Sequence, residues 1–211
     1  MLEPLKELLF PVHCFGCHEI GLAICSKCRR EWNPHFYSKQ IDGLTICSAI
    51  TYGPVARSIL LSAKEDGVKI ADELIIEALL KVIREIPNSA LRNAIFVPIP
   101  ASRRSRRKRG RDFILELVKA ISIQTKIPFQ SGIEIKRALL DQSGLDLMDR
   151  KRNISNAFSS VLPIENDVIL IDDLVTTGAT LLEARRALNV VKTKVRMAIT
   201  ACVAPTPTIR G

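Results

Sequence analysis

The feature that most constrains the fold is the stretch VILIDDLVTTGATL, residues 168–181. Its four leading apolar residues predict a strand buried on both faces, as in the centre of a parallel sheet. Two carboxylates, Asp172 and Asp173, come next, and a short loop rich in threonine then leads into a helix. A strand, a tight loop and a helix in this order direct backbone N–H groups at one point, where they can bind an anion. The stretch therefore predicts a parallel α/β sheet with an anion site at the end of this strand.

Most of the remaining chain alternates between strand and helix patterns, as an open α/β sheet requires. Apolar or β-branched runs predict the strands, and helical spacing of apolar residues predicts the helices. The predicted strands are residues 45–53, 94–100, 168–172 and 194–204; the predicted helices are 67–87, 110–126 and 180–191, with a short helix or turn at 149–158. We expect an open, mostly parallel sheet flanked by helices.

The size and composition of the chain agree with this fold class. With 211 residues, 47% of them hydrophobic and 25% charged, the chain suits one main globular domain with a small appendage. No apolar run approaches the roughly 20 residues that a membrane-spanning helix needs. The start, MLEPLKELLFP, lacks the basic region of a signal peptide. We therefore expect a cytoplasmic protein with reduced cysteines and no membrane span.

Positive charge is concentrated in residues 103–111, RRSRRKRGR. Of the formal net charge of +9, this stretch accounts for seven units, which leaves +2 for the rest of the chain. Such a run favours a local polyanion site over a basic surface everywhere. Three interpretations stay open: contact with a pyrophosphate group, contact with the phosphates of a nucleic acid, or a solvated surface.

Four cysteines near the N-terminus form two C-x2-C pairs in CFGCHEIGLAICSKC: Cys14 with Cys17, and Cys25 with Cys28. Two such knuckles provide the four thiolates of a structural zinc site, which leaves no open position for catalysis. An iron–sulfur cluster or chance spacing are the alternatives. We predict a zinc-binding module at residues 1–43 and the main domain at 44–211. The nearby histidines, His13 and His18, are alternative ligands, but we expect them to lie outside the metal shell.

Two further observations concern the cysteines and the aromatic residues. Cys47 and Cys202 stand alone in predicted strands, where we expect small buried side chains. Six of the ten aromatic residues lie in the first 52 residues: Phe10, Phe15, Trp32, Phe36, Tyr37 and Tyr52. Exposed aromatics on a zinc module can stack on nucleic-acid bases, but a small module also needs aromatics for its core, and we favour the core.

The acidic pair and the loop that follows it make different chemical demands. The hydroxyls of Thr176, Thr177 and Thr180 can donate to a phosphate, and Gly178 allows a ligand to approach the backbone closely. Asp172 and Asp173 would repel that phosphate, so they must face a divalent cation or hydroxyl groups beside it. A vicinal diol next to a phosphate describes phosphoribose. The alternative is an acidic turn that caps a helix through its threonines.

Other phosphate-binding motifs fit less well. The sequence contains neither G-x-x-x-x-G-K-[ST] nor G-x-G-x-x-G, which excludes a P-loop and a dinucleotide fingerprint. A phosphatase-like D-x-D is excluded because residue 174 is leucine.

The stretch IDDLVTTGAT resembles the phosphoribosyl-pyrophosphate signature of type I phosphoribosyltransferases. Together with the four-cysteine module, it resembles the ComF family of competence-associated, phosphoribosyltransferase-like proteins. Several shorter pieces follow the order of that family: VPIP at 97–100, the basic stretch after it, QSGL at 142–145, RKRN at 150–153 and AF at 157–158. The resemblance covers nearly the whole chain.

The resemblance implies a role for each matching residue. Asp172 and Asp173 would contact the ribose hydroxyls, and Thr176, Thr177, Gly178, Ala179 and Thr180 would hold the 5′-phosphate. Lys64 would lie near the pyrophosphate, with Arg109 in a mobile basic loop that closes over it. Gln142 and Gly144 fall in a stretch that approaches the active site in the family. The chain departs from the family where Gly110, Arg111, Asp112 and Phe113 replace the usual Gly-Phe-Asn-Gln.

The resemblance implies an enzyme that binds phosphoribosyl pyrophosphate with magnesium and transfers phosphoribose to an acceptor that the sequence does not identify. Through the family, this activity would be linked to DNA uptake in natural competence. The main alternative is a non-catalytic protein that binds single-stranded DNA or acts as an adaptor among DNA-uptake machinery proteins. A third hypothesis is a regulator that binds a nucleotide without chemistry.

Overall fold

The computed structural model describes residues 12–137, 154–160 and 163–205. Within them, one sheet has the strand order β1-β2-β7-β6-β3, and β4 pairs with β5 in a small second sheet. β1 runs antiparallel to β2, and every other neighbouring pair of the large sheet is parallel. The strands are β1 (Tyr37–Ile41), β2 (Leu44–Thr51), β3 (Ala94–Pro98), β4 (Glu134–Ile135), β5 (Phe158–Ser159), β6 (Asp167–Val175) and β7 (Val195–Val203). The predicted open, mostly parallel sheet is confirmed.

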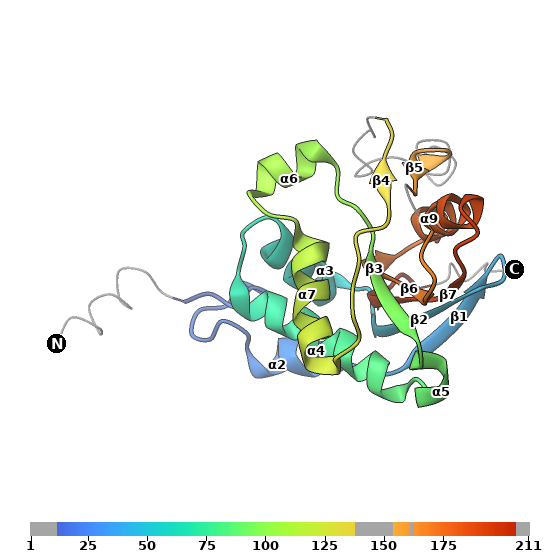
Figure 1. Ribbon diagram of the computed structural model, residues 1–211. Coiled ribbons are helices and arrows are strands. Elements are labelled where there is room, and N and C mark those ends of the chain that lie inside the picture. Colours follow the sequence, from blue (N-terminus) through green and yellow to red (C-terminus); the bar gives the residue numbers. More distant parts are fainter. Residues whose placement is uncertain (1–11, 138–153, 161–162, 206–211) are drawn as a thin grey trace, which may run out of the picture.

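Helices cover both faces of the sheet (Figure 1). Three of them pack on one face: α3 (Pro54–Lys64), α4 (Lys69–Glu85) and α7 (Phe113–Thr125). α9 (Ala179–Val190) packs on the other face. Shorter helices are α2 (Ser26–Glu31), α5 (Asn88–Leu91) and α6 (Arg103–Arg109). No described helix combines the length and apolar character needed to cross a membrane.

The packing of the central strand β6 explains why residues 168–171 are all apolar. Ile169 and Ile171 pack in the core beneath α4 and α7, whereas Val168 and Leu170 pack in the core beneath α9. Alternate side chains of a strand point to opposite faces, so a strand with helices on both sides has apolar residues at every position. β6 lies between β7 and β3, as a central parallel strand should. Asp172 and Asp173 lie in the second half of β6, towards the end at which the loop to α9 begins.

The predicted strands and the three predicted longer helices are found, with shifted ends. The predicted short helix or turn at 149–158 lies mostly outside the described residues. Several elements were not predicted, among them the helices α3 and α6 and the strand β1. The Gly53-Pro54 pair marks the end of β2, and proline at the first helical position also starts α3. Residues 103–109, expected as a mobile loop, form α6. Ser102 caps this helix by accepting a hydrogen bond from the Ser105 amide at 3.0 Å, and Gly110 ends it in a left-handed conformation with φ 67°.

The N-terminal region shares a core with the sheet and its helices. Cys14, Phe15, Cys28 and Trp32 are buried in the same apolar cluster as residues of α3 and α4. The β1–β2 hairpin crosses the predicted boundary between residues 43 and 44. The division into a module at 1–43 and a domain at 44–211 stays a prediction. The buried positions of Cys47 and Cys202 are confirmed, at 3% and 0% exposure.

Candidate functional site

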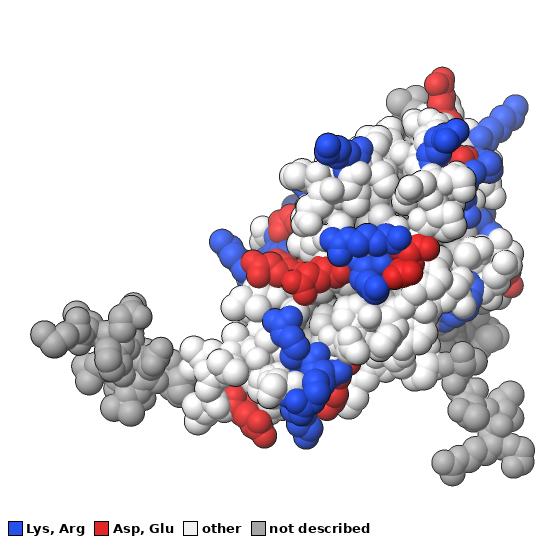
Figure 2. Space-filling model, turned by 90° about the horizontal axis from the view of Figure 1, so that it is seen from below, with Lys and Arg blue, Asp and Glu red and all other residues white. Residues whose placement is uncertain are grey.

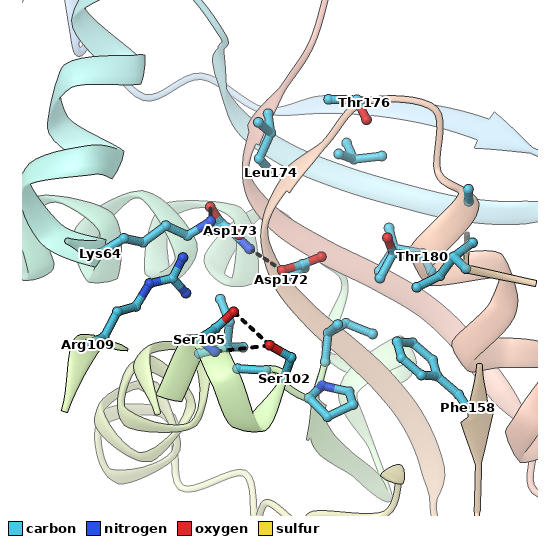
Figure 3. A pocket seen from close by; sticks show the side chains of 18 of the residues that line it. Lys64, Ser102, Ser105, Arg109, Phe158, Asp172, Asp173, Leu174, Thr176 and Thr180 are labelled. Atoms are coloured by element: carbon cyan, nitrogen blue, oxygen red, sulfur yellow. Dashed lines mark hydrogen bonds and ion pairs between the residues drawn. The ribbon is translucent and has the colours of Figure 1, made fainter. Parts of the chain in front are cut away.

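The two acidic residues at the end of β6 lie in different surroundings. Asp173 is 5% exposed, and its side chain points towards Lys64. Asp172 is less buried, and its carboxylate points towards Thr180 (Figure 3). The backbone N–H of Asp173 donates to Asp172 Oδ1 at 2.9 Å. The two neighbouring acids thus face different sides of one site, Asp173 the Lys64 side and Asp172 the Thr180 side.

Asp173 forms an ion pair with Lys64, the last residue of α3, with 2.5 Å between Lys64 Nζ and Asp173 Oδ2. Burial alone would raise the pKa of Asp173, but the Lys64 ammonium outweighs it and holds that pKa below its usual range. Burial likewise opposes the charge of Lys64, and the Asp173 carboxylate outweighs it and raises the pKa of the lysine. Lys64 Nζ also lies 5.8 Å from the ring centroid of Phe113. Lys64 is therefore a fixed positive charge.

Asp172 has no comparable cation. Among the residues that the structure describes, no lysine or arginine forms an ion pair with its carboxylate. Burial, followed by the negative charge of Asp173, raises the pKa of Asp172 well above its usual value. Hydroxyl donors or a cation from a ligand would relieve this cost. Asp172 is thus the acid of the pair that is available to a ligand.

The loop after β6 lies at the start of α9, as the sequence predicts. Gly178 has φ 79°, a left-handed conformation that glycine adopts without strain. A Cβ at Gly178 would lie 2.8 Å from Ile41 Cδ1 of β1, so the loop also needs glycine for its packing. The N–H of Ala179 donates to Thr177 Oγ1 at 3.3 Å. The loop is therefore held tightly between β1 and the first turn of α9.

The short helix α6 lies across the pocket from this loop and contributes positive charge. Arg104, Lys108 and Arg109 line the pocket, together with the cap residue Ser102 and Ser105. None of the residues of α6 is buried. Glu65, next to Lys64, pairs with two of these cations: its Oε2 lies 2.7 Å from Lys108 Nζ, and its Oε1 lies 2.8 Å from an Arg109 guanidinium nitrogen.

One cavity of about 640 Å³ brings together all the residues predicted to bind phosphoribose and pyrophosphate. These residues are Lys64, Arg109, Asp172, Asp173, Thr176, Thr177, Gly178, Ala179 and Thr180. Among the described residues, four cationic and three acidic side chains line the cavity, so its formal charge is only +1. Gln142 and Gly144, and the RKRN stretch, lie outside the described residues.

Phe158 lines the cavity, and the residues that hold it in place were not identified from the sequence. The backbone N–H of Phe158 donates to Glu183 Oε1 at 3.0 Å, and its carbonyl accepts from Arg186 at 3.0 Å. Glu183 and Arg186 also pair with each other at 2.8 Å across one turn of α9. The Glu-x-x-Arg spacing in the predicted helix indicates the Glu183–Arg186 ion pair, but it does not show that the pair contacts Phe158 of β5.

The four N-terminal cysteines form a second candidate site. The sulfurs of Cys14, Cys17, Cys25 and Cys28 all lie within 4.8 Å of one another. A Cβ at Gly16 would lie 2.7 Å from Cys28 Sγ, so glycine lets the first knuckle approach the second. His13 and His18 are exposed and do not belong to the sulfur cluster. Four converging sulfurs are the donor set that a structural zinc site uses.

Hydrogen bonds prepare one of these sulfurs for the charged form. The backbone N–H of Cys25 donates to Cys14 Sγ at 3.3 Å. Burial would raise the pKa of Cys14, but this N–H and those of Cys17 and Gly16 lower the pKa to about 6. Burial and the neighbouring thiols raise the pKa of Cys28. A divalent cation would offset the repulsion among four thiolates.

The surface opposite α6 carries mixed charge. Figure 2 shows this face, where basic and acidic side chains lie beside one another and most of the surface is uncharged. No continuous basic strip crosses this view. This face therefore offers no continuous basic surface.

The comparisons with known proteins found similarity only in structure. No protein-family model matches the sequence, and no curated protein does. Leishmania donovani UMP synthase overlaps with 86% of this chain at 16% identity and a TM-score of 0.37, and the chain spans 32% of that protein. Adenine phosphoribosyltransferase from Leishmania tarentolae matches at 14% identity and a TM-score of 0.38, over 82% of this chain and 71% of that one.

A third structure is adenine phosphoribosyltransferase from Trypanosoma brucei, in complex with AMP, pyrophosphate and ribose-5-phosphate. It gives 8% identity and a TM-score of 0.44, over 85% of this chain and 94% of that one. These overlaps concern the general fold and carry no information about activity.

Proposed function

We propose that this chain is a phosphoribosyltransferase that binds phosphoribosyl pyrophosphate with magnesium and transfers phosphoribose to an acceptor. One observation carries the proposal: Asp172, the loop at Thr176–Thr180 and the cations of α6 line a single cavity. These three groups match the three parts of the donor, which are a diol, a 5′-phosphate and a pyrophosphate.

The order of the groups in space supports this assignment. Asp172 points towards Thr180, so a ribose whose hydroxyls donate to Asp172 would have its 5′-phosphate near the loop and the start of α9. Lys64 and Arg109 lie on the other side of Asp172 (Figure 3). The pyrophosphate on C1 of the ribose would then face these cations. Asp173 acts mainly as the positioning residue for Lys64.

The charge of the cavity supports a role for magnesium. A formal charge of +1 from the described side chains cannot balance a ligand that carries three phosphate groups. The Asp172 carboxylate offers hard oxygen donors of the kind that magnesium prefers, and it fits such an ion better than a soft metal. Bound magnesium would supply positive charge to the leaving pyrophosphate. The protein residues would position the donor and stabilise charge.

The reaction needs no side-chain nucleophile. The bond between C1 and the pyrophosphate oxygen breaks, and its electron pair leaves with the pyrophosphate. A nucleophilic atom of the acceptor forms the new bond to C1, and its proton passes to water. Lys64 and Arg109 stabilise the charge that develops on the leaving group. The wall around Phe158 bounds the cavity and helps to exclude water.

The cysteine cluster has a separate role in the proposal, as a structural zinc site with Cys14, Cys17, Cys25 and Cys28 as ligands. Because it packs on α3, zinc there would stabilise the helix that ends at Lys64. The proposal includes a reducing compartment such as the cytoplasm, because clustered cysteines there are more often metal ligands than disulfides. Membership of the ComF family and a link to competence belong to the proposal, and the acceptor is not identified.

The activity can be tested by measuring pyrophosphate release from phosphoribosyl pyrophosphate and magnesium, with a panel of nucleobases and amines as acceptors. We expect acceptor-dependent release that falls at least tenfold in Arg109→Gln. Arg107→Gln is the matched control, because Arg107 lies on the same helix but does not line the cavity. Donor binding without release for any acceptor would favour the nucleotide-binding regulator.

A second candidate function, binding of single-stranded DNA, is supported by the outer side of α6. Arg103, Arg106 and Arg107 are exposed and do not line the cavity. Such arginines can contact phosphates without sequence preference. Fluorescence anisotropy with a labelled oligonucleotide tests this function. It predicts loss of binding in Arg103→Gln/Arg107→Gln and a steep decrease with salt, and an unchanged anisotropy at low salt would exclude it.

A further inference from the structure

Glu65 occupies an unusual position for an acid, because it lies in a cavity that is otherwise suited to phosphate groups. Its carboxylate forms part of the cavity lining beside Lys64, Lys108 and Arg109. Unlike Asp173, which pairs with Lys64, Glu65 pairs with Lys108 and Arg109. The donor-binding scheme gives it no role. Its contacts therefore need a separate explanation.

Both carboxylate oxygens of Glu65 are engaged by cations of α6. Oε2 accepts from Lys108 Nζ at 2.7 Å. Oε1 accepts from Arg109 Nε at 3.0 Å and lies 2.8 Å from a second guanidinium nitrogen. The Lys108 ammonium, with help from Arg109, lowers the pKa of Glu65, so the carboxylate is charged at neutral pH. Two oxygens on two neighbouring cations is also the pattern that a phosphate group would form.

The same contacts link α6 to the rest of the molecule. No residue of α6 is buried, so apolar packing does little to hold this helix in place. Glu65, at the end of α3, connects α3 to the last turn of α6. Another described link is local, from Arg106 to Asp112 at 3.8 Å. A change of partner at Glu65 therefore affects both the charge of the cavity and the hold on α6.

We propose that Glu65 is a specificity-determining residue that competes with the ligand: its carboxylate holds Lys108 and Arg109, and a pyrophosphate group must take these two cations from it in order to bind. A group with one or two charges competes poorly with a carboxylate that already makes three contacts. A pyrophosphate group can engage both cations at once. Glu65 thus sets a threshold that favours a highly charged anion. This inference rests on the proposed function for the identity of the anion.

The probe for this inference is inorganic pyrophosphate, titrated calorimetrically at low ionic strength without magnesium. We expect Glu65→Gln to bind it roughly threefold to tenfold more tightly than the wild type, because the substitution frees two cations and removes one negative charge. The control is Glu85→Gln. Glu85 pairs with Lys81 at 2.8 Å outside the cavity, so the same loss of charge there should leave the affinity unchanged.

Two further variants distinguish competition from a purely structural role. In the background Lys108→Gln/Arg109→Gln, the gain from Glu65→Gln should shrink, because the cations that it frees are gone. The melting temperature of Glu65→Gln should match that of the wild type within a few degrees, because partly exposed ion pairs contribute little. A melting temperature that falls far below this, with weaker binding, would make Glu65 a structural residue and overturn the inference.

The outcomes separate this inference from the proposed function. Equal or weaker pyrophosphate binding by Glu65→Gln overturns the inference alone, because it would mean that Glu65 positions the cations for the ligand. If neither the wild type nor any variant binds pyrophosphate, without magnesium or with it, the inference and the pyrophosphate part of the proposed function both fail. If Glu65→Gln binds more tightly but no acceptor supports turnover, the inference stands and the transferase activity does not.

Discussion

The four cysteines of the metal cluster lie within residues 14–28, whereas the charged residues of the cavity come from α3, α6 and the end of β6. The cluster depends on two tight knuckles that residues close in sequence can form by themselves. The cavity depends on three elements that meet only when the sheet is complete. Substitutions in the cysteine cluster should therefore lower stability, whereas substitutions in the cavity should mainly weaken ligand binding.

The largest expected effect is the loss of metal from the cluster. If the cluster holds structural zinc, Cys28→Ser should release it and lower the melting temperature by about 10 °C or more, because bound metal stabilises only the folded chain. Metal analysis and thermal melting measure both effects. Cys47→Ser is the control, since Cys47 is also buried but lies outside the cluster. Full zinc content and an unchanged melting curve in Cys28→Ser would contradict a structural metal.

Replacing each of the two acids at the end of β6 by asparagine should change the free energy of unfolding in opposite directions. Asp173→Asn leaves the largely buried Lys64 without its partner and should cost about 2–4 kcal/mol of unfolding free energy at pH 7. Asp172→Asn removes a poorly paired charge beside Asp173, so we expect no loss and a gain of up to about 1 kcal/mol. Urea denaturation measures both values. Equal destabilisation by the two substitutions would remove the distinction between a positioning acid and a ligand-binding acid.

The contributions of the two acids to stability should also depend on pH in opposite directions. Because the pKa of Asp172 is raised in the folded state, the folded chain binds this proton more tightly than the unfolded chain does, and stability falls as the pH rises from the ordinary carboxyl range through the raised pKa. The Asp173 contribution has the opposite sign, because its folded pKa is lowered: it is present above the ordinary value and is lost as the pH falls through the lowered one. Denaturation at several pH values should show that Asp172→Asn lacks the first dependence.

A smaller effect on stability is expected from substitution of Gly178 in the loop between β6 and α9. Gly178→Ala introduces both a left-handed alanine and a contact with Ile41, whereas Gly43→Ala introduces only the left-handed alanine, since nothing lies within 4 Å of its Cβ position. Both variants should lose about 1 kcal/mol from backbone strain, and Gly178→Ala should lose roughly 1–2 kcal/mol more from the contact. Adding Ile41→Val to Gly178→Ala should recover part of this difference. Equal losses at the two glycines would show that β1 does not constrain the loop.

The sequence predicts more of the fold than of the charge arrangement. The apolar run at 168–171 identifies a central strand, because a strand buried on both faces is apolar at every position. The cysteine pairs likewise converge because the spacing within each knuckle is local. In contrast, residues 103–109 were expected as a mobile loop because of the family resemblance, and the Ser102 cap and Gly110 stop of α6 were not recognised.

The ion pairs of the cavity could not be predicted, because they join residues that are far apart in the chain. Lys64 was named for its resemblance to a family position, but its partner Asp173 lies on a different element. Glu65 looks like an ordinary surface acid until α6 is placed beside it. The contacts of Glu183 with Phe158 have the same character, since a helix face does not show which strand it meets.

The most direct test of the account is calorimetric titration of phosphoribosyl pyrophosphate with magnesium into the wild type and Asp172→Asn. The proposed function predicts binding at a single site by the wild type, and a loss of at least tenfold in affinity by Asp172→Asn, which should be at least as stable. Binding that Asp172→Asn retains in full would contradict the assignment of this acid to the ribose. No binding by the stably folded wild type would contradict the proposed function itself.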